Sequence, residues 1–299
     1  MKGRDVLVLK ELGSSLFYFL GRTMLVLSFL ATLTGCSHLF YQNSHQLYSD
    51  PRKAGFSFHE VSFQAKDGQH LYGWYFPAVV KPGDLVKGTI IQFHGNAENM
   101  SSHYASLVWV IRSGYNFLTF DYRGYGRNAG DPNQEGVNAD AVAAIRYVLD
   151  REPAHESKTR DIVLYGQSLG GAVVLRALEE VPNKSRIRAV IVDSAFFSYR
   201  AMACAALARS WLTYFFQPLT YLLVSDAYSP EKSIARVSPL PLLVIHGDHD
   251  SVVPFELGKG IFERSREPHE FWQVKSGQHI QVMDDPVYRE RLLKYLDTR

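Results

Sequence analysis

Short runs of apolar residues alternate along this chain with longer stretches whose apolar positions recur at helical spacing. The runs predict eight strands, at 56–65, 70–76, 88–95, 115–122, 161–166, 187–193, 241–247 and 270–275. The longer stretches predict helices at about 98–112, 135–150, 168–180, 255–266 and 285–297. Several runs are apolar throughout, as strands covered on both faces are. Two strands joined by an Asp-Gly turn, followed by strand–helix alternation, predict an α/β fold with a mostly parallel eight-stranded sheet flanked by helices.

The segment 195–229 breaks this alternation, because it is longer and more aromatic than a single crossover requires. One interpretation is a long core helix followed by a second amphipathic piece. The other is a short helical lid, or an apolar pocket wall over the end of the sheet. The aromatic side chains that would form this wall are Phe196, Phe197, Trp211, Tyr214, Phe215 and Phe216.

The first 35 residues differ in composition from the rest of the chain. Four basic residues precede an apolar run from Met24 to Leu33, which is about as long as the core of a signal peptide and too short to span a bilayer by itself. The run ends in Leu33-Thr34-Gly35-Cys36, which resembles the lipobox of bacterial lipoproteins. The resemblance implies a signal peptide at 1–35, lipidation of Cys36, a tether at 36–55 and a folded domain at 56–299.

Ser37, rather than an aspartate, follows the candidate lipidation site, as in lipoproteins sent on to the outer membrane. The alternative is an uncleaved anchor helix in the inner membrane, running from about Leu12 to Leu33. Both interpretations attach the protein to a membrane, and we expect the folded domain on the periplasmic side.

Charge and cysteine usage exclude several classes of partner. Without residues 1–35, Lys plus Arg falls from 32 to 28 and Asp plus Glu from 30 to 28, so the remaining chain is formally neutral. This balance argues against nucleic-acid binding. The chain has no zinc-binding spacing and no dinucleotide-binding glycine pattern, so we expect neither a metal nor a cofactor. Cys204, in an alanine-rich stretch, is expected to be a buried structural thiol.

The pattern G-x-S-x-G lies at the end of the predicted strand 161–166, with Ser168 between Gly166 and Gly170. The pattern alone is weakly specific. Its position between a predicted strand and a predicted helix is what a serine nucleophile on a sharp turn requires. The amino terminus of the following helix favours negative charge at this point. Ser168 is therefore the candidate nucleophile.

A serine nucleophile needs a histidine base, and that histidine needs a carboxylate to hold its tautomer. His279 lies on the loop directly after the last strand, whereas His269 precedes that strand and falls at the opposite edge of the sheet. Three carboxylates follow neighbouring strands: Asp248, Asp250 and Asp193. The order along the chain would then be serine, aspartate, histidine.

That order, and several motifs in register with it, resemble the α/β-hydrolase family over nearly all of residues 56–299. HGNAEN (94–99) resembles the oxyanion loop of the family, DYRGYG (121–126) a turn after the next strand, and GQSLGG (166–171) the nucleophile elbow. HGDHDSVVP (246–254) is similar to the H-G-x-x-D-x-x-V-P motif, which identifies Asp250 as the acid. The branch of the family it resembles contains small membrane-tethered hydrolases, including uncharacterised bacterial proteins and eukaryotic thioesterases that remove palmitoyl groups from proteins.

The resemblance implies a serine hydrolase that cleaves esters or thioesters through a covalent acyl-enzyme. Ser168, His279 and Asp250 would form the triad, and the backbone amides of Asn96 and Leu169 the oxyanion hole. His94 would hold the oxyanion loop, and Asp121 and Arg123 would pair within their turn. A small or lipid-like acyl substrate is expected. An aminopeptidase and a non-catalytic lipoprotein that binds a partner or lipid through 195–229 are the alternatives.

Overall fold

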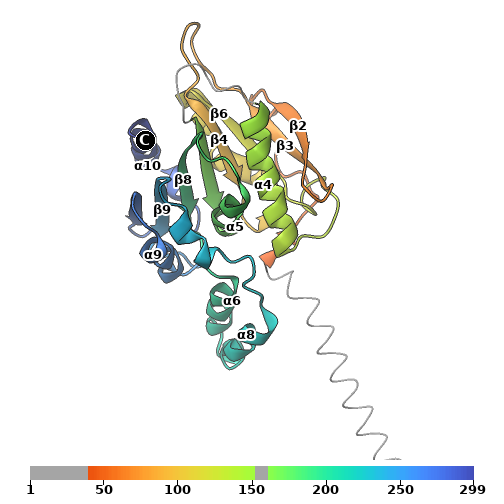
Figure 1. The fold of residues 1–299 in the computed structure, drawn as a ribbon, viewed down its shortest axis with the longest axis vertical. Helices are drawn as coiled ribbons and strands as arrows, with labels where there is room; N and C mark the ends of the chain where they lie inside the picture. Colours follow the sequence, from red (N-terminus) through yellow and green to blue (C-terminus); the bar gives the residue numbers. More distant parts are fainter. Residues whose placement is uncertain (1–39, 152–160) are drawn as a thin grey trace, which may run out of the picture. The chain divides into compact units, whose positions relative to one another are not determined.

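The computed structural model describes residues 40–151 and 161–299, and residues Tyr41–Arg299 form one compact unit (Figure 1). Cys36 and the apolar run before it lie outside the described residues. Within the described part of the chain, we find no helix that is both long and apolar enough to cross a membrane.

The unit is built on an eight-stranded sheet with the order β10-β9-β8-β7-β4-β6-β3-β2. The outer hairpin strand β2 pairs antiparallel with β3, β3 pairs antiparallel with β6, and all other neighbours are parallel. The strands span His59–Gln64 (β2), His70–Phe76 (β3), Gly88–Phe93 (β4), Tyr115–Phe120 (β6), Ile162–Gln167 (β7), Ile187–Asp193 (β8), Leu242–Gly247 (β9) and His269–Val274 (β10). The predicted α/β class and mostly parallel sheet are confirmed.

Burial explains why the five central strands are predominantly apolar. β4, β6, β7, β8 and β9 are buried along their full length, whereas the edge strand β2 alternates between exposed and half-buried residues. The Asp-Gly turn forms as predicted between β2 and β3. The amide of Ala65 donates to the carbonyl of Gln69, and Gly68 adopts φ +87°, which favours glycine.

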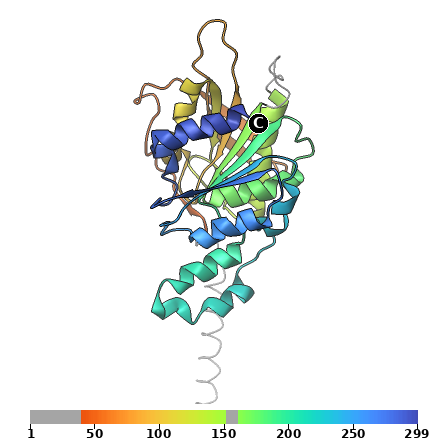
Figure 2. The same ribbon diagram turned by 90° about the vertical axis from the view of Figure 1, so that its left-hand side faces the viewer.

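Helices cover both faces of the sheet (Figure 2). α4 (Gln134–Arg151), α5 (Leu169–Ala177) and α9 (Phe255–Arg264) pack on one face. On the other face, α10 (Pro286–Asp297) and three short helical turns share the main hydrophobic core with the strands. These turns are α3 (Met100–His103), η1 (Tyr104–Ser106) and η2 (Val108–Ser113), in place of the single helix predicted at 98–112.

The segment after β8 forms a group of short helices that stands at the carboxyl end of the sheet (Figures 1 and 2). It consists of α6 (Tyr199–Ala208), α7 (Trp211–Tyr214), η4 (Gln217–Leu219) and α8 (Thr220–Leu223). We call residues 195–225 the lid segment. The interpretation as a long core helix is wrong, because Ser210 caps a new helix at α7 and Pro218 begins η4.

Part of the predicted tether packs onto the fold. Residues Gln42–Asn43 form β1, which pairs in parallel with Ala97–Glu98 (β5), and the amide of Gln42 donates to the carbonyl of Asn96 at 3.0 Å. Two-residue strands leave no periodic signal, so the sequence could not indicate them. The first residues of the described unit therefore brace the HGNAEN loop.

Candidate active site

Ser168 lies at the junction of β7 and α5 in a strained backbone conformation. Its φ of +53° and ψ of −117° fall where residues with side chains rarely lie. The amide of Ser168 donates to the carbonyl of Asp193 at 2.8 Å, which fixes the turn against the neighbouring strand β8. This geometry matches the sharp strand-to-helix turn that the G-x-S-x-G pattern predicts.

The glycines around Ser168 are required by close backbone approach. A Cβ on Gly166 would lie 2.6 Å from the carbonyl oxygen of Gly170, and one on Gly171 would lie 2.5 Å from the Cβ of Ala195. A Cβ on Gly170 would overlap the carbonyl of Phe93 at the end of β4. α5 therefore packs against β4 and β8 closely enough to fix Ser168 above the carboxyl end of β7.

Asp250 and His279 come together on the loops after β9 and β10. The Nδ1 of His279 donates to Oδ2 of Asp250 at 2.8 Å, and the Asp250 carboxylate is fully buried. Oδ1 of Asp250 accepts hydrogen bonds from the amides of Val252 and Val253, each at 2.8 Å. Because Nδ1 carries the proton, Nε2 of His279 has a free lone pair, as a general base requires.

The electrostatic environment keeps Asp250 ionised. Burial alone would raise the pKa of its carboxyl, but hydrogen bonds from His246 and His279 hold that pKa well below its ordinary value. The Nε2 of His246 lies 3.4 Å from Oδ2 of Asp250 and 3.0 Å from the carbonyl oxygen of Val253. An ionised carboxylate in this position stabilises an imidazolium at His279.

The other two candidate acids lie elsewhere. Asp248 is at the surface, where it accepts hydrogen bonds from the Gln273 side chain and the amide of Ser276. Asp193 is buried and accepts from the hydroxyls of Tyr165 (3.1 Å) and Ser194 (3.2 Å). Burial raises the pKa of Asp193 to about 6, against the opposing effects of Tyr165, His279 and His246. Only Asp250 of the three makes a hydrogen bond to His279 within the described residues.

Ser168, Asp193, Asp250 and His279 lie at or just beyond the carboxyl ends of β7, β8, β9 and β10, which are consecutive in the sheet. The connections from β4 and β7 run to opposite sides at this end of the sheet, and this switch point is the position at which open α/β sheets bind ligands. Within the described residues, the Ser168 hydroxyl and Nε2 of His279 form no hydrogen bond, with each other or with any other group. Both atoms are therefore free for a substrate.

The backbone around the candidate oxyanion hole is held from several sides. The carbonyl of Asn96 accepts hydrogen bonds from the Tyr125 hydroxyl (2.8 Å) and the amide of Gln42. Leu169 is the first residue of α5, whose Ser168 cap gives no side-chain hydrogen bond. Neither the Asn96 nor the Leu169 amide donates a hydrogen bond to another described residue, so both remain available to an oxyanion.

The predicted pairing of Asp121 with Arg123 is wrong. Arg123 instead binds Asp140 through two nitrogens, the closer at 2.7 Å, and Asp67 at 2.8 Å. Asp121 accepts a hydrogen bond from the amide of Met100 (2.7 Å) and lies 3.4 Å from Nε2 of His94. The two side chains diverge because the chain enters a turn at Arg123, just after the end of β6.

The six aromatic residues predicted as one pocket wall separate into two groups. Phe196 is buried against the Tyr199 ring, and the Arg264 guanidinium lies over Phe197, 3.9 Å from the centre of the Phe197 ring. The other four, Trp211, Tyr214, Phe215 and Phe216, are exposed on the lid segment. Cys204 is half-buried and donates to the Gln217 side chain, so the predicted full burial is also wrong.

Three residues near the site were not predicted. His246 contacts Asp250, and Ser194 accepts a hydrogen bond from the amide of Ile280, next to His279, at 3.1 Å. His103 stacks on His94 with its Nε2 3.0 Å from the carbonyl of Ala97, and burial lowers its pKa to about 4. The first histidine of the HGDHDSVVP motif was a usable signal for His246. Ser194 and His103 had none, because their role depends on tertiary contacts.

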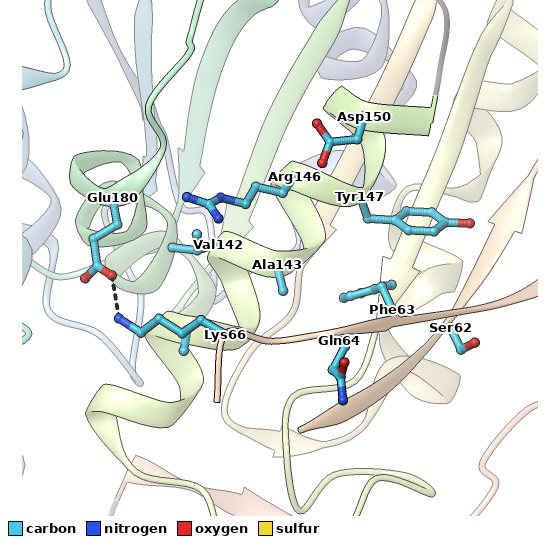
Figure 3. Close-up of a pocket in the computed structure, with 11 residues that line it drawn as sticks. Ser62, Phe63, Gln64, Lys66, Val142, Ala143, Arg146, Tyr147, Asp150 and Glu180 are labelled. Atoms are coloured by element: carbon cyan, nitrogen blue, oxygen red, sulfur yellow. Dashed lines mark hydrogen bonds and ion pairs between the residues drawn. The ribbon is translucent and has the colours of Figure 1, made fainter. Parts of the chain in front are cut away.

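A separate cavity of about 390 Å³ lies between β2 and α4 (Figure 3). Its rim includes the Lys66–Glu180 ion pair at 3.0 Å, with Phe63 and Tyr147 along one wall. The candidate triad residues are not part of its lining. In the part of the chain with described coordinates, His, Cys, Asp and Glu side chains form no group of three able to hold a metal ion.

Comparison with known proteins identifies the family. A family model described as serine aminopeptidase, S33, matches residues 84–237. The uncharacterized protein YfhR of Escherichia coli K12 is 36% identical over 263 residues, covering 87% of this chain and 86% of the relative. Human protein ABHD12B is 30% identical over 203 residues, covering 64% and 53%. An esterase from Pyrococcus furiosus superposes with a TM-score of 0.65 at 22% identity, over 87% of this chain and 96% of that one. The chain belongs to the α/β-hydrolase superfamily.

Proposed function

We propose that this protein is a serine hydrolase that cleaves carboxylic esters or thioesters through a covalent acyl-enzyme. The observation that carries the proposal is the hydrogen bond from His279 to the buried Asp250 carboxylate, at the same end of the sheet as the strained Ser168 turn. Structural neighbours named as esterases, from Pyrococcus furiosus and Exiguobacterium antarcticum, support the choice of reaction.

In the proposed reaction, Ser168 Oγ attacks the acyl carbon while Nε2 of His279 takes the hydroxyl proton. The oxygen of the tetrahedral intermediate accepts hydrogen bonds from the Leu169 and Asn96 amides. His279 then gives the proton to the leaving alkoxide or thiolate, and the acyl group stays on Ser168. Water attacks this ester with His279 again as the base, which releases the carboxylic acid and restores Ser168.

Peptide hydrolysis is the second candidate, because the matching family model is described as a serine aminopeptidase. An aminopeptidase needs an acidic group for the substrate amine. The lid segment contains no Asp or Glu, and Asp226, which follows it, is engaged by Ser198, Ser229 and Arg200. The absence of a free acid on this segment favours acyl esters.

A fluorophosphonate probe tests the nucleophile, with Ser168→Ala and Ser233→Ala compared. Ser233 is a suitable control because it is a buried serine away from the candidate triad, and its hydroxyl makes no hydrogen bond within the described residues. We expect labelling of the wild type and of Ser233→Ala, and none of Ser168→Ala. A folded wild type that resists the probe would contradict the proposal and favour a non-catalytic lipoprotein. Rates on p-nitrophenyl esters of increasing chain length, against aminoacyl anilides, separate an esterase from an aminopeptidase.

A further inference from the structure

The lid segment presents a cluster of large apolar side chains to solvent. We call these eight residues the lid surface: Trp211, Leu212, Tyr214, Phe215, Phe216, Leu219, Tyr221 and Leu222. Their exposed fractions range from 37% at Leu219 to 79% at Phe215, and all eight lie within twelve consecutive positions. Soluble monomers rarely expose so many large apolar groups together, and such patches mark sites of contact with a partner or a membrane.

Polar contacts on the inner side hold this surface in place. Thr220 is buried and its hydroxyl donates to the carbonyl of Gln217 at 2.7 Å, while the Gln217 side chain accepts from Cys204 on α6 at 3.1 Å. The Arg200 guanidinium lies 5.1 Å from the ring centre of Tyr221. The exposed side chains are therefore the outer face of a fixed helical group, and no described part of the chain covers them.

The chemistry of the segment fits the surface of a lipid bilayer. Residues 195–225 contain no carboxylate and two arginines, Arg200 and Arg209, so nothing on this segment repels lipid phosphates. One tryptophan and two tyrosines stand among the aliphatic and phenylalanine side chains, the mixture that is enriched at membrane interfaces.

The chain also begins its folded unit beside the lid segment. The hydroxyl of Tyr41, the first residue of the unit, lies 3.5 Å from that of Tyr199, the first residue of α6. The 40 residues before Tyr41 include the apolar run Met24–Leu33. The chain therefore enters the folded unit beside the lid segment.

We propose that the lid surface docks on the lipid bilayer as a second membrane contact, separate from the N-terminal attachment. In this orientation the strand ends that bear Ser168 and His279 lie on the membrane side of the unit, where an acyl chain can reach them without crossing water. The docking does not depend on the proposed hydrolase activity, so each can fail without the other.

Trp211 is a native probe for this contact. Of the four tryptophans, Trp74 and Trp272 are buried and Trp109 is half-buried, whereas Trp211 is 78% exposed. The full chain is bound to vesicles of phosphatidylcholine and phosphatidylglycerol with brominated acyl chains, and tryptophan emission is recorded. We expect quenching that Trp211→Phe removes. Leu222→Asp should reduce it strongly, because a charge on the lid surface opposes insertion.

Val287→Asp is the matched control, since Val287 is 69% exposed on α10, away from the lid segment (Figure 1). It should keep the quenching of the wild type, and equal thermal unfolding of the two Asp variants excludes misfolding. Unquenched Trp211 in vesicle-bound protein would overturn the proposal, as would unchanged quenching in Leu222→Asp. A blue-shifted, concentration-dependent Trp211 emission without lipid would instead assign the surface to a second copy of the chain. Fluorophosphonate labelling of Ser168, measured in parallel, reports the hydrolase activity independently.

Discussion

At the scale of single residues, two aspartates on one loop show how position decides chemistry. Asp248 and Asp250 are separated by a single residue, yet only Asp250 is buried and bonded to His279. Asp248 points to the surface and bonds to Gln273 and Ser276. The first carboxylate therefore faces the edge strand β10, whereas the second lies between His246 and His279. These two positions allow a closely matched test of the proposed triad.

Asp250→Asn should lower kcat by about four orders of magnitude, the size of the effect in a protease triad, because an amide holds the wrong histidine tautomer. Asp248→Asn should leave kcat near that of the wild type. Steady-state hydrolysis of a p-nitrophenyl ester measures both, with fluorophosphonate labelling as a second readout. If the two variants lost activity equally, the assignment of the acid would fall.

The buried carboxylate of Asp193 should make stability depend on pH. Its pKa is raised to about 6, so the folded state holds a proton that the unfolded chain releases near pH 4. The contribution of protonated Asp193 to the free energy of unfolding is fully present below the pKa of the unfolded chain. It is lost as the pH rises through about 6, and the loss amounts to about 3 kcal/mol.

Asp193→Asn should remove this loss, because an amide does not titrate. Chemical denaturation at several pH values between about 4 and 7 measures the free energy of unfolding of wild type and variant. The difference between the two should change steeply with pH. The effect of Asp250 has the opposite sign. Because its pKa is lowered, the ionised carboxylate stabilises the fold at pH values above the ordinary aspartate pKa, and this stabilisation is lost as the pH falls. A constant difference across the range would contradict the predicted titration of Asp193.

The sequence indicated the principal site residues because each has a local signature. Ser168 lies between glycines, His279 follows the last strand, and the resemblance of the 246–254 motif selected Asp250 from three candidates. His103 and Ser194 were missed, since their proximity to the site arises from packing between distant segments. Pattern reasoning found residues within motifs and could not find residues that act through tertiary contacts.

At the scale of elements, α4, α9 and α10 agree with their predicted ranges within two residues, as most strands do, and the helix predicted at 98–112 is the exception. Continuous apolar runs mark buried strands, so β3 and β8 match their predicted ranges and the bounds of β4, β6, β7, β9 and β10 agree within two residues. The predicted helix at 98–112 is broken into short turns, because Leu107 leaves helical geometry and Val108, Val110 and Ile111 are poor helix formers. Its apolar spacing reflected burial on the sheet rather than one continuous helix.

The contact between β1 and the HGNAEN loop depends on one buried side chain. Asn99 donates to the carbonyls of Ser44 (2.9 Å) and Gln46 (2.7 Å), and its oxygen accepts from the amide of Ser101 (2.9 Å) at the start of α3. One residue therefore joins the first segment of the unit to the loop that bears Asn96.

Asn99→Ala should release this segment and destabilise the fold by about 1–2 kcal/mol through the lost cap and hydrogen bonds. Hydrogen exchange should accelerate at the amides of Gln42 and Ser44, which donate to Asn96 and Glu98. Asn133→Ala is the control, because Asn133 caps α4 through the amide of Gly136 and does not contact β1. Equal exchange at Gln42 in the two variants would show that Asn99 does not hold the segment.

At the scale of the whole molecule, we propose two contacts with the membrane, from different parts of the chain. One is the N-terminal apolar run that ends at Cys36, and the other is the exposed lid surface. The tether alone would leave the folded unit free to rotate above a bilayer. A second contact fixes its orientation, and two weak contacts on one chain bind more tightly than either alone because the first raises the effective concentration of the second.

The proposed N-terminal attachment has two alternative forms, a lipidated Cys36 and an uncleaved anchor helix, and labelling together with mass measurement distinguishes them. If Cys36 is lipidated, Cys36→Ser should lose incorporation of a clickable palmitate and keep the mass of the unprocessed chain. Cys204→Ser should keep both the label and the mature mass, because the only other cysteine is half-buried on α6. Intact mass spectrometry of membrane fractions measures processing. An unlabelled wild type with its full-length mass would favour the anchor helix, and in that case the lid surface would still be expected to dock, since its contact does not use Cys36.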